Sequence, residues 1–151
     1  MVLGFASEAI TFGSFCYLYP SEPDAIYTKH GVLNVEWSKF SENDRFTEYL
    51  GKERHFDEES LTADILVLGS YQSPQTSIHE NSKIIYSSVV MHQSINCRNR
   101  TVSVQDLLMF SRALSKGQLV KDLYNLDWDL GEAQSGSIDE KKVASLCDFA
   151  V

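Results

Sequence analysis

This chain contains two long runs of strand-forming residues, which constrain its fold more than any other feature. They lie at 64–71 (DILVLGSY) and 83–95 (KIIYSSVVMHQSI). Both runs are rich in apolar residues and contain several β-branched ones, which favour a pleated and partly buried backbone. Shorter runs of the same kind occur at 9–19, 25–28 and 32–37, with turn-forming clusters between them. The pattern predicts an α+β fold with a mostly antiparallel sheet of about five or six strands, flanked by one or two helices.

A short helix is predicted at the C-terminal end. Ser137 and Glu140 stand three residues apart and form a capping-box pattern, which marks the start of a helix. Apolar residues then follow at helical spacing and form one stripe that must pack against another element: Val143, Leu146, Cys147 and Ala150.

A second helix is predicted over residues 41–51 (SENDRFTEYLG). Ser41 can cap it, Phe46 and Leu50 are four residues apart, and Gly51 stands where a helix commonly ends.

Three further segments have weaker patterns. Residues 72–81 are polar and contain a proline, so they are predicted to form a loop. Residues 119–130 are expected to be mostly loop with a short strand. Residues 101–113 begin with a strand pattern, but taken alone the stretch favours a helix.

Composition and charge exclude several classes of partner. The chain has 151 residues, a length expected for a single domain spanning 1–151. Its 13 Lys+Arg and 21 Asp+Glu give a net charge of −8, which argues against binding to nucleic acid or anionic lipid. No apolar run approaches the roughly 18–20 residues that span a bilayer, so no membrane span is expected. An acidic chain suits a basic protein partner.

No set of residues in the sequence points to catalysis or to a metal. There is no CxxC motif, no phosphate-binding loop and no nucleophile motif, and no histidine has a partner at metal-site spacing. Cys16 lies in an aromatic strand pattern, where a buried, unreactive thiol is the simpler interpretation than a nucleophile. We therefore expect no enzyme activity, no catalytic residue, no metal and no cofactor.

Several motifs between residue 64 and the end of the chain occur in a characteristic order. They are the strand ADILVLGSY, then 87–89 (SSV), 96–99 (NCRN), 116–118 (KGQ), and 136–140 (GSIDE) leading a helix that ends at Cys147. In this order the chain resembles the surface-adhesin protein E family, a group of small bacterial secreted or lipid-anchored proteins.

The resemblance carries several implications. It implies a disulfide between Cys97 and Cys147, and it leaves Cys16 unpaired. It implies a strand over 101–113, against the local helical preference, and this is the prediction we adopt. It also implies a non-enzymatic protein that binds host extracellular or plasma proteins. A disulfide favours an exported location, periplasmic or at the cell surface, with a leader absent from this sequence. The N-terminal residues do not resemble a signal peptide, so a cytoplasmic location stays the alternative.

Two kinds of binding protein fit these observations. The first is an adhesin-type module, possible also as a homodimer, whose exposed aromatic side chains anchor a protein partner. The second is an immunity protein that neutralises a cognate basic toxin through acidic residues. The candidate contact residues are Trp128, Asp127, Asp129, Trp37, Tyr17 and Tyr19.

The implied disulfide predicts the number of free thiols. Of the three cysteines, only Cys16 should react when the unreduced protein is unfolded and titrated with a thiol reagent. After reduction all three should react, which serves as the control. Three reactive thiols before reduction would contradict the pairing.

Overall fold

The computed structural model describes residues 25–28 and 31–148. The chain divides into two compact units, residues 1–35 and 36–151. Within the first unit, β1 (Ala25–Thr28) pairs antiparallel with β2 (Gly31–Asn34), as the runs at 25–28 and 32–37 predicted. The strand expected at 9–19 lies outside the described residues.

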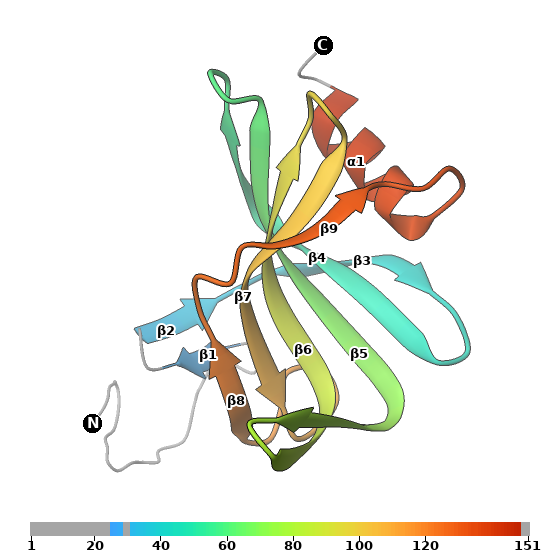
Figure 1. Ribbon diagram of the computed structural model, residues 1–151. Coiled ribbons are helices and arrows are strands. Elements are labelled where there is room, and N and C mark those ends of the chain that lie inside the picture. The colour runs from blue at the N-terminus through green and yellow to red at the C-terminus, as the bar shows by residue number, and fades with distance from the viewer. Residues whose placement is uncertain (1–24, 29–30, 149–151) are drawn as a thin grey trace. The chain divides into compact units, whose positions relative to one another are not determined.

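The second unit is built on a seven-stranded sheet in which every strand pair is antiparallel. The strand order is β3-β4-β5-β6-β7-β8, and β9 also pairs with β7 (Figure 1). The bounds are β3 (Trp37–Glu42), β4 (Phe46–Asp57), β5 (Thr62–His79), β6 (Ser82–Asn96), β7 (Thr101–Phe110), β8 (Leu119–Leu123) and β9 (Trp128–Glu132). With the helix α1 (Ile138–Cys147), this confirms the expected class, with slightly more strands than predicted.

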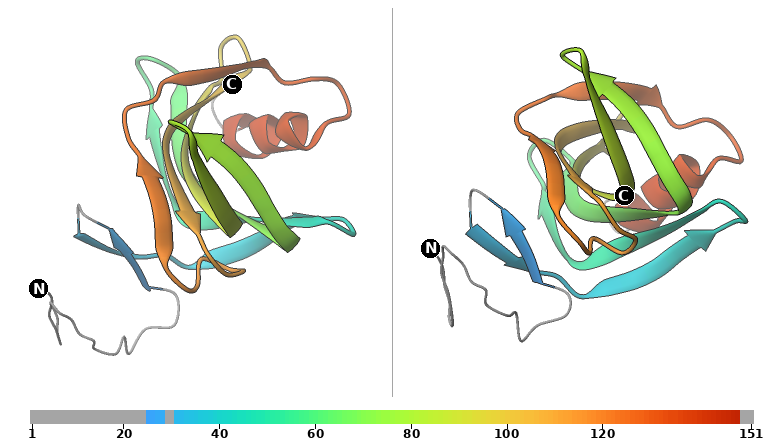
Figure 2. Two further views of the ribbon diagram at one scale, coloured as in Figure 1. Left: turned by 60° about the horizontal axis from the view of Figure 1, so that its bottom comes forward. Right: turned by 90° about the horizontal axis from the view of Figure 1, so that it is seen from below.

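The main core lies between α1 and one face of this sheet, which we call the helix face (Figure 2). Strand residues alternate between faces, so side chains two apart, such as Ala63, Ile65 and Val67 of β5, share the face that packs against α1. The stripe residues of α1 are buried as predicted, and Ala150 lies outside the described residues. The core residues are Leu50, Ala63, Ile65, Val67, Ile95, Val102, Val143, Leu146 and Cys147. Each fully buried Leu or Ile contributes about 1.5–3 kcal/mol relative to an exposed one.

The helix predicted over 41–51 is wrong, because the chain forms the end of β3, a turn and the start of β4 there. Phe46 and Leu50 are an even number of residues apart, so they share a face in a strand as well as in a helix. Asn43 stabilises a turn between the two strands, because its Oδ1 accepts hydrogen bonds from the backbone N–H groups of Arg45 (2.8 Å) and Phe46 (3.0 Å). Pairing with β5 then fixes the strand.

Three other segments also contain strands. The loop predicted over 72–81 is largely wrong, since β5 continues to His79 after a register shift between Ser70 and Gln75 that accommodates the proline. Residues 101–110 form β7, which confirms most of the strand adopted over 101–113 from the family resemblance, whereas 111–113 belong to the following loop. Its neighbours β6, β8 and β9 supply the pairing that overrides the local helical pattern. The segment 119–130 contains β8 and the start of β9.

Gly69 lets an aromatic ring pack directly onto β5. A Cβ atom at this position would lie 2.5 Å from Phe46 Cζ and 3.4 Å from Val89 Cγ2. The Phe46 ring continues into an aromatic row, with its centroid 4.7 Å from Tyr71 and Tyr71 6.0 Å from Tyr86. Burial raises the pKa of the Tyr71 hydroxyl above its usual value of 10.0, and the nearby Tyr86 and Glu48 add to this effect.

We expect Gly69→Ala to lower the free energy of unfolding by about 1–3 kcal/mol, because the added methyl group must displace the Phe46 ring. Urea denaturation measures the change. In a Phe46→Leu background the same substitution should cost less, since the ring is then absent. An equal cost in both backgrounds would rule out the ring contact as the cause.

Candidate functional site

A disulfide joins the sheet to the helix at the edge of the main core. Cys97 follows the end of β6 and Cys147 ends α1, and their sulfur atoms are bonded with the Cα atoms 5.6 Å apart. This is the pairing that the family resemblance implied. The bond closes a loop with a sequence separation of 50 residues, which in the chain-entropy model stabilises the fold by about 4 kcal/mol.

A buried polar cluster lies between α1 and the sheet. Lys142 of α1 has no exposed surface, and its Nζ donates a hydrogen bond to Gln93 Oε1 of β6 (3.1 Å). The same Nζ lies 3.0 Å from Glu48 Oε1 of β4, whose side chain is 8% exposed, and 3.6 Å from Asp139 Oδ1. Buried charges are costly unless they are paired, so this cluster fixes the position of α1 on the sheet.

The opposite face of the sheet carries a polar row near one end, which we call the polar face. His55, Asp64, Ser94, Ser103 and Asp129 are register partners across β4, β5, β6, β7 and β9 in turn. Directly paired residues place their side chains on the same face. The row therefore presents imidazole, carboxylate and hydroxyl groups to solvent beside one another.

His92 lies next to this row and contacts two carboxylates. Its Nδ1 is 3.2 Å from Asp106 Oδ2 and its Nε2 is 3.4 Å from Asp64 Oδ1. The three side chains are each about one third exposed, with 34% for His92. Each ring nitrogen thus lies near one carboxylate, and the imidazole bridges β5 and β7 from its place on β6.

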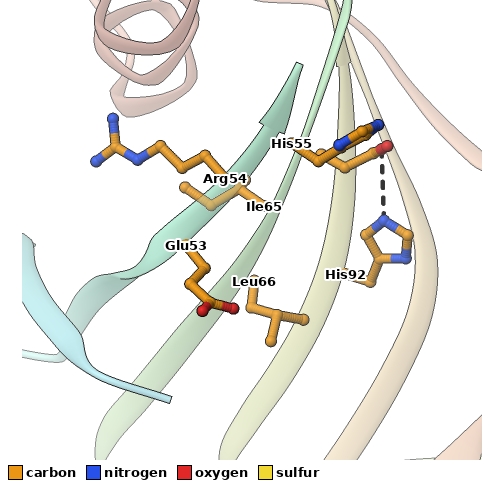
Figure 3. A pocket seen from close by; sticks show the side chains of 7 residues that line it. Glu53, Arg54, His55, Ile65, Leu66 and His92 are labelled. Atoms are coloured by element: carbon orange, nitrogen blue, oxygen red, sulfur yellow. Dashed lines mark ion pairs between the residues drawn. The ribbon is translucent and has the colours of Figure 1, made fainter. Parts of the chain in front are cut away.

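An open depression of about 570 Å³ lies beside His92. It is located where the pairing of β4 with β5 shifts register, between Leu50 and Arg54. Figure 3 shows the ion pair of His92 at this site, with the Arg54 side chain pointing away from the imidazoles of His55 and His92. The charged groups do not converge on one point. The depression therefore lacks the arrangement of an enclosed active site.

The motifs that carry the family resemblance have structural roles. Ser88 Oγ donates to the carbonyl of Arg112 (2.6 Å) and accepts from the N–H of Ser115 (2.8 Å). The N–H of Leu114 donates to Ser70 Oγ (3.1 Å). Gly117 has φ = +78°, which favours glycine. These contacts fold the loop after β7 back onto the sheet.

The predicted contact residues Asp127, Trp128 and Asp129 lie at the exposed edge formed by β9. Trp128 is 47% exposed, and its neighbour Leu130 is 53% exposed. Asp129 pairs with Ser103 on the polar face, whereas Trp128 pairs with Val104 on the helix face. Asp127 accepts a hydrogen bond from Gln105 Nε2 (3.3 Å). Trp128 and Asp129 therefore lie on β9, on opposite faces, and Asp127 directly precedes the strand.

The other predicted contact residues do not join this group. Trp37 begins β3, at the opposite edge of the strand order from β9. It is half-buried, and its indole Nε1 is buried with no hydrogen-bond partner among the described residues. Tyr17 and Tyr19, like Cys16, lie outside the described residues.

The connection into β9 is tied to β7. The N–H of Asn125 donates to Asp106 Oδ1 (3.0 Å), and the N–H of Leu126 donates to the carbonyl of Gln105 (2.8 Å). Asp106 therefore joins His92 of β6 to the segment that presents Trp128. Sequence reasoning missed His92 and Asp106, because their association depends on the register of β6 and β7.

Sequence reasoning also missed Lys142. A signal for it exists, since Lys142 stands four residues before Leu146 and thus on the same side of a helix as the apolar stripe. Its partners Glu48 and Gln93 are distant in the sequence and carry no such signal.

Taken together, the second unit is a small, disulfide-linked antiparallel sheet domain with an exposed edge strand. A family model for surface-adhesin protein E matches residues 37–148, which include the whole seven-stranded sheet and α1. The chain belongs to the surface-adhesin protein E family. No curated protein and no solved structure matches the chain.

The family is one of adhesins, which fits a binding role and an exported or surface protein with a disulfide. Among residues 25–28 and 31–148, no group of three or more His, Cys, Asp or Glu side chains is placed to hold a metal ion. No helix in the described part of the chain is long and apolar enough to cross a membrane.

We expect Asp106→Ala to lower the free energy of unfolding by about 1–2 kcal/mol, because it removes both the His92 contact and the acceptor for Asn125 N–H. Urea denaturation measures this. Asp64→Ala is the matched control, since it removes only the 3.4 Å contact to His92 and should cost less than about 1 kcal/mol. Equal losses would show that the bond to Asn125 contributes nothing.

Proposed function

We propose that this chain is a non-enzymatic module that binds a protein partner through the β9 edge. The family match supports a binding role, and the exposed Trp128 is the observation that carries the choice of surface. Tryptophan is enriched among the few residues that dominate binding energy, because it buries a large apolar area with few rotatable bonds. By resemblance, the partner is a host extracellular or plasma protein.

The local structure of β9 suits it for contact. Strand β9 has five residues and pairs with β7 along one side. Gly131 has φ = +85° and its N–H donates to Asp129 Oδ1 (2.8 Å), which bends the strand and shortens the regular edge. A short, bent edge disfavours open-ended strand addition. Side chains, rather than backbone pairing, therefore provide the contact.

The charge around Trp128 selects among partners. Asp127 and Asp129 flank Trp128 in the sequence and both are exposed, with Asp129 on the opposite face of β9 from the indole. Exposed carboxylates along this edge favour a partner that carries Lys or Arg beside its pocket for Trp128, since opposite charges speed encounter and fix orientation. The net charge of −8 acts in the same direction over longer range.

The alternative is an immunity protein that blocks a basic toxin with the same acidic residues. It makes a different prediction about ionic strength, because a contact dominated by exposed charges weakens steeply as salt is added. Binding that depends mainly on Trp128 and weakly on salt favours the adhesin-type module. An upstream gene for a polymorphic toxin would favour the immunity protein.

The test is to immobilise the purified chain and measure the binding response to diluted blood plasma and to solubilised extracellular matrix. Trp128→Ala should weaken the response about tenfold or more, while the melting temperature changes little because Trp128 is half exposed.

Ile85→Ala is the matched control, since Ile85 is 53% exposed near the turn of the β5–β6 hairpin, far along β6 from residues 93–96, which face the part of β7 that pairs with β9. It should leave the response unchanged. A large fall in melting temperature for Trp128→Ala would assign Trp128 to the core instead. Equal binding by the two variants would exclude the β9 edge as the contact surface.

A further inference from the structure

An amine, a primary amide and a carboxylate meet in a site closed to solvent between α1 and the sheet. Lys142 is 0% exposed, Gln93 is 3% exposed and Glu48 is 6% exposed. Lys142 Nζ lies 3.1 Å from Gln93 Oε1 and 3.0 Å from Glu48 Oε1. A stability role alone does not require this combination, since apolar side chains of similar size often stabilise a core equally well.

We propose that Lys142 and Gln93 form an intramolecular isopeptide bond, with Glu48 as the group that transfers protons. The three groups are a nucleophile, an electrophilic carbonyl and a general base, held in contact by three separate elements of the fold. The product is an amide cross-link between α1 and β6, and ammonia is released.

The reaction balances without an oxidant or a second substrate. Glu48 takes a proton from the Lys142 ammonium group, and the freed lone pair of Nζ attacks Gln93 Cδ. Glu48 then passes a second Nζ proton to Gln93 Nε2, and the Cδ–Nε2 bond breaks as the carbonyl re-forms. Ammonia departs with the proton still held by Glu48, so it leaves as ammonium and the carboxylate is restored.

The surroundings favour each step. Lys142 Nζ and Glu48 Oε1 lie 3.0 Å apart, within the reach that a general base requires. Gln93 Nε2 lies 3.8 Å from Met91 Sδ, and this contact turns the amide so that its carbonyl oxygen faces Lys142. Folding holds the reactants together, which replaces the entropy cost of an encounter between separate molecules. The burial of all three side chains also shields the bond from hydrolysis.

The bond would duplicate the connection made by the disulfide. Gln93 and Cys97 both belong to β6 or its end, and Lys142 and Cys147 both belong to α1. The amide cannot be reduced, so α1 would stay attached to the sheet in a reducing environment. This cross-link is independent of the binding surface proposed on β9.

The mass of the intact natural chain decides the proposal. After folding, reduction and denaturation, the protein should be lighter than its sequence mass by about 17 Da, the mass of one ammonia lost. Proteolysis followed by tandem mass spectrometry should identify one branched peptide that joins Lys142 to Gln93. A mass equal to that of the sequence, or a loss located at other residues, overturns the proposal.

Two variants separate the chemistry from mere burial. Glu48→Gln removes the proton acceptor while keeping the size of the side chain, and it should restore the full sequence mass. Asp139→Asn is the matched control, because Asp139 is a carboxylate near the same amine, at 3.6 Å, but 39% exposed. It should retain the loss of about 17 Da. Loss of ammonia in Glu48→Gln would contradict the role given to Glu48. Since the natural chain is decisive alone, a variant that fails to fold does not weaken the test.

Discussion

The packing of α1 against the helix face of the sheet is the interaction on which the rest of the second unit depends. Val143 and Leu146 are almost fully buried there, together with strand residues such as Ile95 and Val102. Without α1, this face of the sheet would expose its apolar side chains to water. A ten-residue helix is too short to be stable by itself, so tertiary contacts must hold it.

Three different kinds of contact hold it. The apolar stripe contributes buried hydrophobic area, which does not fix an orientation. The buried Lys142 cluster fixes the position of the helix along the sheet through Glu48 and Gln93. The disulfide ties the last residue of the helix to the residue that follows β6. Directional contacts select one docked position, whereas hydrophobic contact tolerates small shifts.

The motifs that identify the family serve the scaffold rather than the contact surface. Ser88 and Gly117 shape the loop after β7, Ser137 caps α1 through its bond to the N–H of Glu140 (3.1 Å), and the cysteines join helix to sheet. The residues proposed for binding lie on β9, outside those motifs. Members of such a family can keep one fold while the exposed edge differs, because scaffold and contact residues are separate.

The sequence by itself determined those features whose partners are close along the chain. The capping box of α1, its apolar stripe and the strands at 64–71 and 83–95 were correct because local backbone contacts and periodicity specify them. Pairing of Cys97 with Cys147 came from the family resemblance. Tertiary structure decided the rest. Residues 41–51 carry a spacing that suits a helix and a strand alike, and pairing with β5 selected the strand. The burial of Lys142 depends on Glu48 and Gln93, and the two carboxylates around His92 depend on strand register, so neither arrangement exists until distant segments meet.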